Sequence, residues 1–340
     1  MDFGNRSGDA GSVPQQPGLS AGDDAPERDA ERGAGPDGPL PARPPIVNEE
    51  PPAARGEEPP AGQDKAAPAA PRSGRNLPVA AGIGVLLGGI VVLTLFTVKA
   101  TFLIFMGAAA VVALWELGRA LGSRGIHAPV IPVAVGGAAM WACEYWWNDQ
   151  AVLAALILTV IVILAWRLPG GTDGYLRDVM AGTFALIYIA LMATFIVAML
   201  APADGARRVL AFVILTICSD IGGYFAGSLL GRHPMARIIS PNKTWEGLAG
   251  SVFACLVAGA ILLPVLLHGY AWQGVLTGAA AVTAAILGDL AESAIKRDLQ
   301  IKDMGSILPG HGGVLDRIDS LLVSAPVIWL VLAAFLSGRS

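Results

Sequence analysis

Charged residues are scarce in this sequence. Asp, Glu, Lys and Arg make up 15% of the 340 residues, and the formal net charge is −4, whereas soluble domains carry about 25% charged residues. Because there is no basic excess, we expect no nucleic acid as a partner. The three cysteines Cys143, Cys218 and Cys255 lie far apart in apolar runs, which excludes a disulfide framework or a zinc site as the organising feature. Neither GxxxxGK[ST] nor GxGxxG occurs after residue 77, so the apolar part of the sequence has no P-loop or Rossmann nucleotide site.

Hydrophobic residues are abundant, at 54%, and the mean hydropathy is +0.58. They are concentrated after residue 77. Residues 1–77, in contrast, hold 14 of the 24 prolines and 21 charged residues. That first segment cannot bury enough apolar surface to offset its chain entropy, so we expect a disordered tail. It also lacks the apolar run near residue 1 that a secretory signal needs. The remainder has the composition of an integral membrane protein.

The apolar segments predict an all-α fold, a polytopic membrane bundle of about nine transmembrane helices, since a bilayer requires roughly 20 apolar residues per helix. We divide the chain into the tail (1–77), a first group of transmembrane helices (78–205) and a catalytic transmembrane region with motif loops (206–340). The predicted spans are 78–98, 101–121, 128–147, 151–166, 179–201, 208–230, 247–267, 273–291 and 320–336.

The distribution of Lys and Arg predicts the orientation of these spans. With the N-terminus in the cytoplasm, four basic residues lie outside: Lys99, Arg207, Arg208 and Arg339. Thirteen lie inside: Arg72, Arg75, Arg119, Arg124, Arg167, Arg177, Arg232, Arg237, Lys243, Lys296, Arg297, Lys302 and Arg317. We therefore expect a multi-pass protein of the cell (inner) membrane with a cytoplasmic N-terminus.

A first polar region, 216–247, interrupts the apolar pattern. Asp220 falls near the middle of the sixth span, where an ionised carboxylate is costly unless it is paired, solvated or bound to a cation. The glycines at 223, 227 and 231 recur every fourth residue, which favours close approach of another helix. Ser240-Pro241 resembles an N-cap followed by a first-turn proline, and would place Lys243 in the first turn of the seventh span. There Lys243 would either bind phosphate or extend to lipid headgroups.

A second polar region, 288–319, contains acids and bases at helical spacing. Asp289, Glu292, Ser293 and Lys296 follow i, i+3, i+4 and i+7, which puts them on one helical face. Asp316 and Asp319 are spaced i, i+3 after a glycine-rich loop, 309–313, whose backbone could approach a ligand closely. Carboxylates could hold a divalent cation while the bases neutralise phosphate oxygens. This combination is typical of metal-assisted chemistry on a nucleoside triphosphate.

Other charged residues suggest simpler roles. Glu116 with Arg119 is interpreted as an interfacial pair at the end of the second span. Asp173 and Asp178 lie among Arg167 and Arg177 and are interpreted as part of a hydrated loop.

The motifs Ser293-x-x-Lys296-Arg297-x4-Lys302-Asp303 and Pro309-x-His311-Gly312-Gly313-x-x-Asp316-Arg317-x-Asp319 resemble the signature of the CDP-diacylglycerol synthase (phosphatidate cytidylyltransferase) family. Ser219-Asp220 and the segment 240–247 are also similar to that family, which often has lysine where this chain has Asn242. The resemblance covers most of 78–340. It implies a membrane enzyme of phospholipid biosynthesis that joins CTP to phosphatidic acid, giving CDP-diacylglycerol and pyrophosphate.

The resemblance also implies a Mg²⁺ cofactor and a homodimer, to which the glycine face of the sixth span could contribute. Carried over to this sequence, the metal ligands would be Asp289 and Asp316. The catalytic residues would be Asp289, Asp316, Lys296 and Asp220. The substrate-binding residues would be Lys243, Arg297, Lys302, His311, Arg317, Ser240 and Ser293.

Two other functions are compatible with the same residues. A CTP-dependent enzyme could act on an ether lipid or a polyprenol, because spans of Leu, Val and Ala do not identify a lipid. An ion-coupled transporter could use Asp220 and Asp289 as coupling sites, although transporters often contain inverted repeats and the glycine-histidine loop occurs once.

Overall fold

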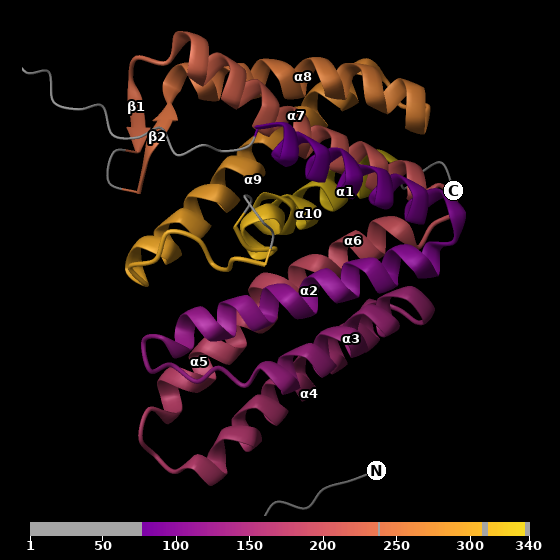
Figure 1. The fold of residues 1–340 in the computed structure, drawn as a ribbon. Helices are drawn as coiled ribbons and strands as arrows, with labels where there is room; N and C mark the ends of the chain where they lie inside the picture. Colours follow the sequence, from indigo (N-terminus) through magenta and orange to yellow (C-terminus); the bar gives the residue numbers. More distant parts are fainter. Residues whose placement is uncertain (1–76, 237–238, 308–311, 337–340) are drawn as a thin grey trace, which may run out of the picture. The chain divides into compact units, whose positions relative to one another are not determined.

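The computed structural model describes residues 77–236, 239–307 and 312–336 (Figure 1). The predicted disorder of the tail falls outside these residues, apart from Leu77, and so does the predicted substrate contact of His311. The remaining chain is almost entirely helical. The elements are α1 (Leu77–Thr97), α2 (Lys99–Gly122), α3 (Val130–Trp146), α4 (Asp149–Arg167), the 3-10 turn η1 (Leu168–Gly170), α5 (Tyr175–Ala185), the π-helical turn η2 (Leu186–Leu191), α6 (Met192–Leu200), α7 (Gly205–Leu230), β1 (Pro234–Ala236), β2 (Ser240–Thr244), α8 (Trp245–Leu267), α9 (Ala271–Asp298) and α10 (Leu315–Leu336).

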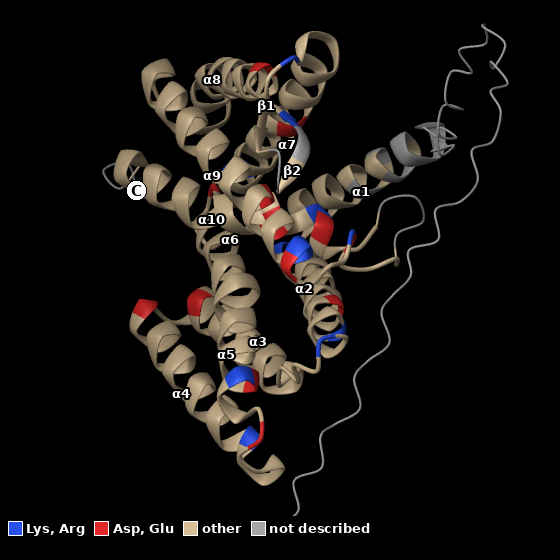
Figure 2. Cartoon of the chain, turned by 90° about the vertical axis from the view of Figure 1, so that its left-hand side faces the viewer, with Lys and Arg blue, Asp and Glu red and all other residues tan. Residues whose placement is uncertain are grey.

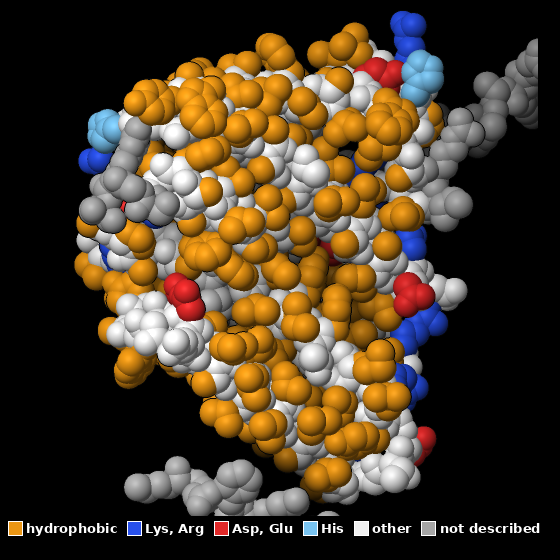
Figure 3. Space-filling model, turned by 180° about the vertical axis from the view of Figure 1, so that it is seen from behind, with side chains coloured by type: hydrophobic (Ala, Val, Ile, Leu, Met, Phe, Trp, Pro, Cys, Tyr) orange, Lys and Arg blue, Asp and Glu red, His pale blue; other side chains and the backbone are white. Residues whose placement is uncertain are grey.

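The all-α membrane fold predicted from the sequence is confirmed. Each of the nine predicted spans falls on a helix, and α5, η2 and α6 together form the fifth as one continuous segment. Among the described residues, seven helical segments are long and apolar enough to cross a membrane. The other two predicted spans fall on helices with shorter apolar segments. Helix α3 has 17 residues, and the apolar segment of α1 is Gly88–Thr97. Hydrophobic side chains dominate the rear face of the molecule, while Lys and Arg lie at its sides (Figure 3).

Two hydrophobic clusters hold the helices together, and α2 and α10 contribute to both. One cluster includes Leu117 of α2, Ile189 of η2 and Leu315 of α10. The other includes Phe212 of α7 and Ile328 of α10. The start of α10 therefore packs in one cluster and its end in the other, and α2 is present in both.

The last two membrane helices are longer at their polar ends than predicted. Helix α9 continues to Asp298 rather than ending at 291, and α10 begins at Leu315 rather than at 320. The charged residues at these ends form ion pairs within and between the two helices, such as the pair between Lys296 and Glu292 one helical turn apart. The two extended helices carry Asp289, Glu292, Asp316 and Asp319, whose helical spacing was predicted from the sequence.

The N-cap predicted at Ser240 for the seventh span is wrong. Ser240 and Pro241 belong to strand β2, which pairs antiparallel with β1 in register Pro234↔Thr244 and Ala236↔Ser240. Helix α8 begins at Trp245, where the Thr244 side chain accepts a hydrogen bond from the Gly247 amide at 3.1 Å. Threonine is a good N-cap, so it takes the role that was predicted for Ser240. Lys243 consequently lies in a strand and not in the first turn of the helix.

The glycine face of α7 packs against α8 of the same chain. A Cβ at Gly223 would lie 2.5 Å from Ser251 Oγ, and one at Gly222 would lie 2.7 Å from the Gly250 carbonyl oxygen. The Ser251 hydroxyl donates to the Ser219 carbonyl at 2.6 Å across this contact. The predicted close approach of a helix is confirmed, and the neighbour is internal. This face is therefore occupied within the protomer and is not available to a second copy.

Two of the minor interpretations are also wrong. Asp178 is not in a hydrated loop: its side chain is 1% exposed, and Arg167 Nε lies 2.8 Å from its Oδ2. Glu116 is fully buried and is not an interfacial partner of Arg119, whose guanidinium lies over the Trp115 ring at 5.5 Å. Both acids point inward because backbone N–H groups of other segments donate to them.

Candidate active site

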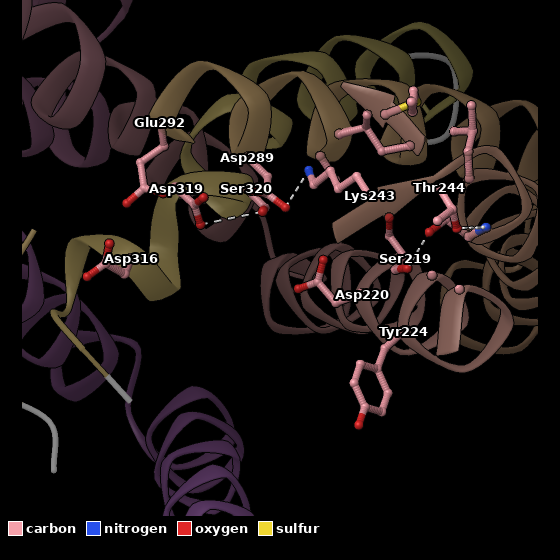
Figure 4. Close-up of a pocket in the computed structure, with 18 of the residues that line it drawn as sticks. Ser219, Asp220, Tyr224, Lys243, Thr244, Asp289, Glu292, Asp316, Asp319 and Ser320 are labelled. Carbon is pink, nitrogen blue, oxygen red and sulfur yellow. Dashed lines mark hydrogen bonds and ion pairs between the residues drawn. The ribbon is translucent and has the colours of Figure 1, made fainter. Parts of the chain in front are cut away.

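Six elements, α7, β1, β2, α8, α9 and α10, line a polar cavity of about 530 Å³, and four of them supply its main polar side chains (Figure 4). Ser219, Asp220 and Tyr224 come from α7, and Lys243 and Thr244 from β2. Asp289, Glu292 and Lys296 come from α9, and Asp316, Arg317, Asp319 and Ser320 from the start of α10. The described lining therefore includes five carboxylates and three basic side chains. An excess of acid over base in a partly buried cavity favours the binding of a cation.

Three of the acids form a tight cluster. One carboxylate oxygen from each of Asp289, Glu292 and Asp319 lies within 4.8 Å of the others. Glu292 is 1% exposed and Asp319 is 6% exposed. The second oxygen of Glu292, Oε1, is buried and has no hydrogen-bond partner among the described residues. A buried carboxylate oxygen without a donor is costly in a protein on its own, and a hard divalent cation would satisfy it.

Lys243 and Lys296 connect the acids. Lys243 Nζ lies 2.5 Å from Asp289 Oδ2, which ties the hairpin to α9. Lys296 Nζ lies 2.5 Å from Glu292 Oε2 and 3.0 Å from Asp316 Oδ1, which ties α9 to α10. A lysine held between carboxylates at a cavity wall can transfer its contacts to a phosphate without leaving the site.

Asp316 is held by the loop that precedes it. Its carboxylate accepts hydrogen bonds from the Met304 amide at 3.0 Å and the Gly313 amide at 2.8 Å, in addition to the contact with Lys296. Gly312 has a φ of 84°, a left-handed conformation that favours glycine. Asp316 thus fixes the loop between α9 and α10 onto the first turn of α10.

The structure brings together about half of the predicted site residues. Asp220, Lys243, Asp289, Lys296, Asp316 and Arg317 line the cavity. Ser240, Ser293, Arg297 and Lys302 do not. Ser293 supports the site indirectly, since its hydroxyl lies 3.3 Å from Asp289 Oδ1. Arg297 is exposed and donates to the Ile239 carbonyl at 3.3 Å, and Lys302 is exposed in the loop after α9.

Sequence reasoning did not include Glu292 and Asp319 among the site residues. Both had a visible signal, because each lies three residues after a predicted acidic ligand, Asp289 or Asp316, and so shares its helical face. Thr244 and Ser251 of the lining had no such signal. Their place in the site depends on the hairpin and on how α8 packs against α7.

The charged residues of the molecule gather in two main places. In Figure 2 they gather where α2, α9 and the β1–β2 hairpin come together, with a smaller group at the ends of α4 and α5. A direct link joins two of these parts, because the Arg124 guanidinium after α2 donates to the Leu299 carbonyl after α9 at 2.8 and 2.9 Å. The ends of α2 and α9, which come from different halves of the chain, are therefore joined.

The chain is similar to known proteins over most of its length. The sequence model of the Cytidylyltransferase family matches residues 79–335. The chain is similar to "Phosphatidate cytidylyltransferase" of Mycobacterium leprae (strain TN), with 39% identity over 279 residues, covering 77% of this chain and 89% of the relative. The protein of that name from Mycobacterium tuberculosis (strain ATCC 25618 / H37Rv) is 39% identical over 277 residues, covering 77% and 84%. That from Staphylococcus aureus (strain COL) is 29% identical over 235 residues, covering 68% and 89%. With its family match spanning most of the chain, this membrane protein belongs to the Cytidylyltransferase family.

Proposed function

We propose that this chain is a phosphatidate cytidylyltransferase, which converts CTP and phosphatidic acid to CDP-diacylglycerol and pyrophosphate by metal-assisted nucleotidyl transfer. One observation carries the proposal: five carboxylates and three basic groups converge on one cavity at the ends of membrane-capable helices, in a chain of the Cytidylyltransferase family. A charged lipid headgroup and a nucleotide could meet in such a cavity while the acyl chains stay among the helices.

In this reaction, a phosphate oxygen of phosphatidic acid attacks the α-phosphorus of CTP. The bond between that phosphorus and the oxygen bridging to the β-phosphate breaks, and pyrophosphate leaves with the electron pair. The attacking phosphate is already anionic near neutral pH, so it needs little help from a general base. The main barrier is to bring two polyanions together in the correct orientation, which requires positioning and charge neutralisation.

The acidic cluster fits a divalent cation, which we propose to be Mg²⁺. Asp289 is common to the predicted metal pair and to the cluster that it forms with Glu292 and Asp319. Asp316 lies beside them and is held by Lys296, so it would act as a ligand once Lys296 turned to a phosphate. When bound, the cation would neutralise phosphate oxygens and stabilise the leaving pyrophosphate.

The basic residues of the cavity would bind the phosphates. Lys243 and Lys296 already lie at the cavity wall in contact with carboxylates, and Arg317 lines the same space. Asp220 faces them from α7 and would shape the headgroup side of the site. Arg297, Lys302, Ser240 and Ser293 would act at the approach to the cavity, and a contribution of His311 stays a prediction.

We also propose that the cavity opens to the cytoplasm of a cell (inner) membrane, because CTP is a cytoplasmic nucleotide and basic side chains favour that side. Lys243, Lys296 and Arg317 line the cavity, and Arg124 donates to the Leu299 carbonyl just after α9. The homodimer that the family resemblance implies stays a prediction, and its interface would have to differ from the glycine face of α7.

Turnover of labelled CTP tests the proposed function. Purified protein in mixed micelles with phosphatidic acid and CTP labelled at the α-phosphate is expected to transfer the label to extractable lipid and to release pyrophosphate in equal amount. A chelator should stop both, because the excess carboxylates would lose their counter-charge, and added Mg²⁺ should restore them. An ether-linked lipid and a polyprenol serve as parallel substrates. Labelling of either in preference to phosphatidic acid, or no consumption of CTP, would contradict the proposal.

A further inference from the structure

Glu116 of α2 is a buried carboxylate outside the candidate active site. It is 0% exposed. Its Oε2 accepts a hydrogen bond from the Leu315 amide at 2.9 Å, across 199 residues of sequence. Its Oε1 is buried and has no hydrogen-bond partner among the described residues. A carboxylate in this state is destabilising by itself, so its presence calls for an explanation.

The position of Glu116 supplies that explanation. Leu315 is the first residue of α10, where backbone N–H groups have no acceptor within the helix. The negative charge of Glu116 therefore caps this helix from a different part of the chain and complements its dipole. Asp316, the next residue, belongs to the candidate active site.

Two glycines of the loop between α9 and α10 pack directly on the same carboxylate. A Cβ at Gly305 or at Gly313 would overlap with the Glu116 side chain. The neighbouring amides of Met304 and Gly313 donate to Asp316. The loop thus lies between two carboxylates: Glu116 lies against its glycines on one side, and Asp316 binds its amides on the other.

We propose that Glu116 is a positioning residue for the proposed reaction: it fixes Gly305, Gly313 and the start of α10, and so orients Asp316 and its partner Lys296 toward the cavity. The expected effect of Glu116 on kcat rests on the proposed function. Its expected effect on the position of Gly305, Gly313 and the start of α10 does not. The positioning role also gives α2, which lies in the first half of the chain, a part in the site formed by the second half.

Three variants test this role. Glu116→Ala removes the acceptor for the Leu315 amide, and displacement of the loop should lower kcat by about 10- to 100-fold, since small misplacements at a reacting site have effects of this size. The KM for CTP should change less than kcat, because Lys243 is not attached to this loop. Glu116→Gln keeps an acceptor of the same shape and should retain activity within about fivefold. Glu144→Ala on α3 is the matched control, a glutamate removed from a membrane helix away from the cavity.

Hydrogen exchange gives a readout that does not depend on activity. In Glu116→Ala, the amides of Met304, Gly313 and Leu315 should exchange at least about tenfold faster than in the unaltered protein, as local opening of the loop becomes easier. In Glu144→Ala and Glu116→Gln their exchange should change little. All rates and activities are normalised to folded protein recovered by size-exclusion chromatography.

The outcomes separate the two proposals. If the unaltered protein does not use phosphatidic acid, the proposed function fails, and hydrogen exchange alone decides the role of Glu116. Unchanged exchange at the three amides, or a kcat per folded molecule within twofold of the unaltered protein in Glu116→Ala, overturns the positioning role. Faster exchange confined to these amides, with the activity of Glu116→Gln retained, supports it.

Discussion

Two buried acids in this protein, Asp178 and Glu292, have opposite environments. Asp178, near the start of α5, is 1% exposed and fully satisfied: Arg167 lies 2.8 Å from Oδ2, and the His127 amide donates to Oδ1 at 2.9 Å. Glu292 in the cavity is equally buried, yet its Oε1 has no donor among the described residues. Asp178 has two arginines near it, whereas the five cavity acids share three bases.

The difference distinguishes a structural ion pair from a candidate active site. Burial alone does not, because the side chains of Asp178 and Glu292 are both 1% exposed. An acid whose oxygens all have donors links segments of the chain. Asp178 on α5 links the loop before α3, through His127, to the end of α4, through Arg167. A cluster of acids with too few donors leaves binding capacity for a ligand. The following predictions test this distinction.

The largest effect is expected for Asp289→Asn. Asp289 contributes to the acidic cluster and to the contact with Lys243. Loss of its charge should weaken cation binding and lower kcat/KM by about 10²–10⁴-fold. The reason is that a bound metal stabilises the charge of the transition state by several kcal/mol. Steady-state assays with labelled CTP over a range of Mg²⁺ concentrations would measure this loss, and size-exclusion chromatography would show that the protein still inserts and folds. Near-normal turnover would remove Asp289 from the metal site.

A smaller loss is expected for Lys296→Ala. Lys296 contacts both Glu292 and Asp316, so its removal takes away a phosphate-binding group and leaves two acids without their base. We expect kcat/KM to fall by about 10²-fold, and the free energy of unfolding to fall by about 3 kcal/mol because a buried charge becomes unpaired.

Lys296→Arg is the matched control, since it keeps the charge but changes its geometry. It should recover the stability and only part of the activity. If Lys296→Ala kept its activity and lost only stability, Lys296 would be a structural residue like Arg167, and the comparison between the two buried acids would fail.

The sequence predicted the helices and the main acids of the site because their signals are local. Apolar runs mark each span, and i, i+3, i+7 spacing puts Asp289, Glu292 and Lys296 on one face of α9. It did not predict that Lys243 would lie in a strand, because the competition between Ser240 and Thr244 as helix caps is decided by the pairing of β1 with β2.

Long-range contacts were the least predictable. Glu116 lies 199 residues from its partner Leu315, and Asp178 lies 51 residues from its donor His127. In the sequence, each has a nearby arginine that suggests a surface pair, and no periodic pattern indicates otherwise. Both acids turn inward because distant backbone amides need acceptors, and this requirement appears only when the helices are packed.

The smallest effect on catalysis is expected for Asp178→Asn. The amide keeps the shape of the side chain but loses the charge that pairs with Arg167, so the unfolding midpoint in detergent should fall by about 5 °C. Because Asp178 does not line the cavity, kcat/KM per folded molecule should stay within about twofold of the unaltered protein. Thermal unfolding monitored by size-exclusion chromatography, together with labelled-CTP assays on the same samples, measures both quantities. A large loss of turnover with an unchanged midpoint would mean that satisfied buried acids can also serve the reaction, and the distinction drawn from Glu292 would no longer hold.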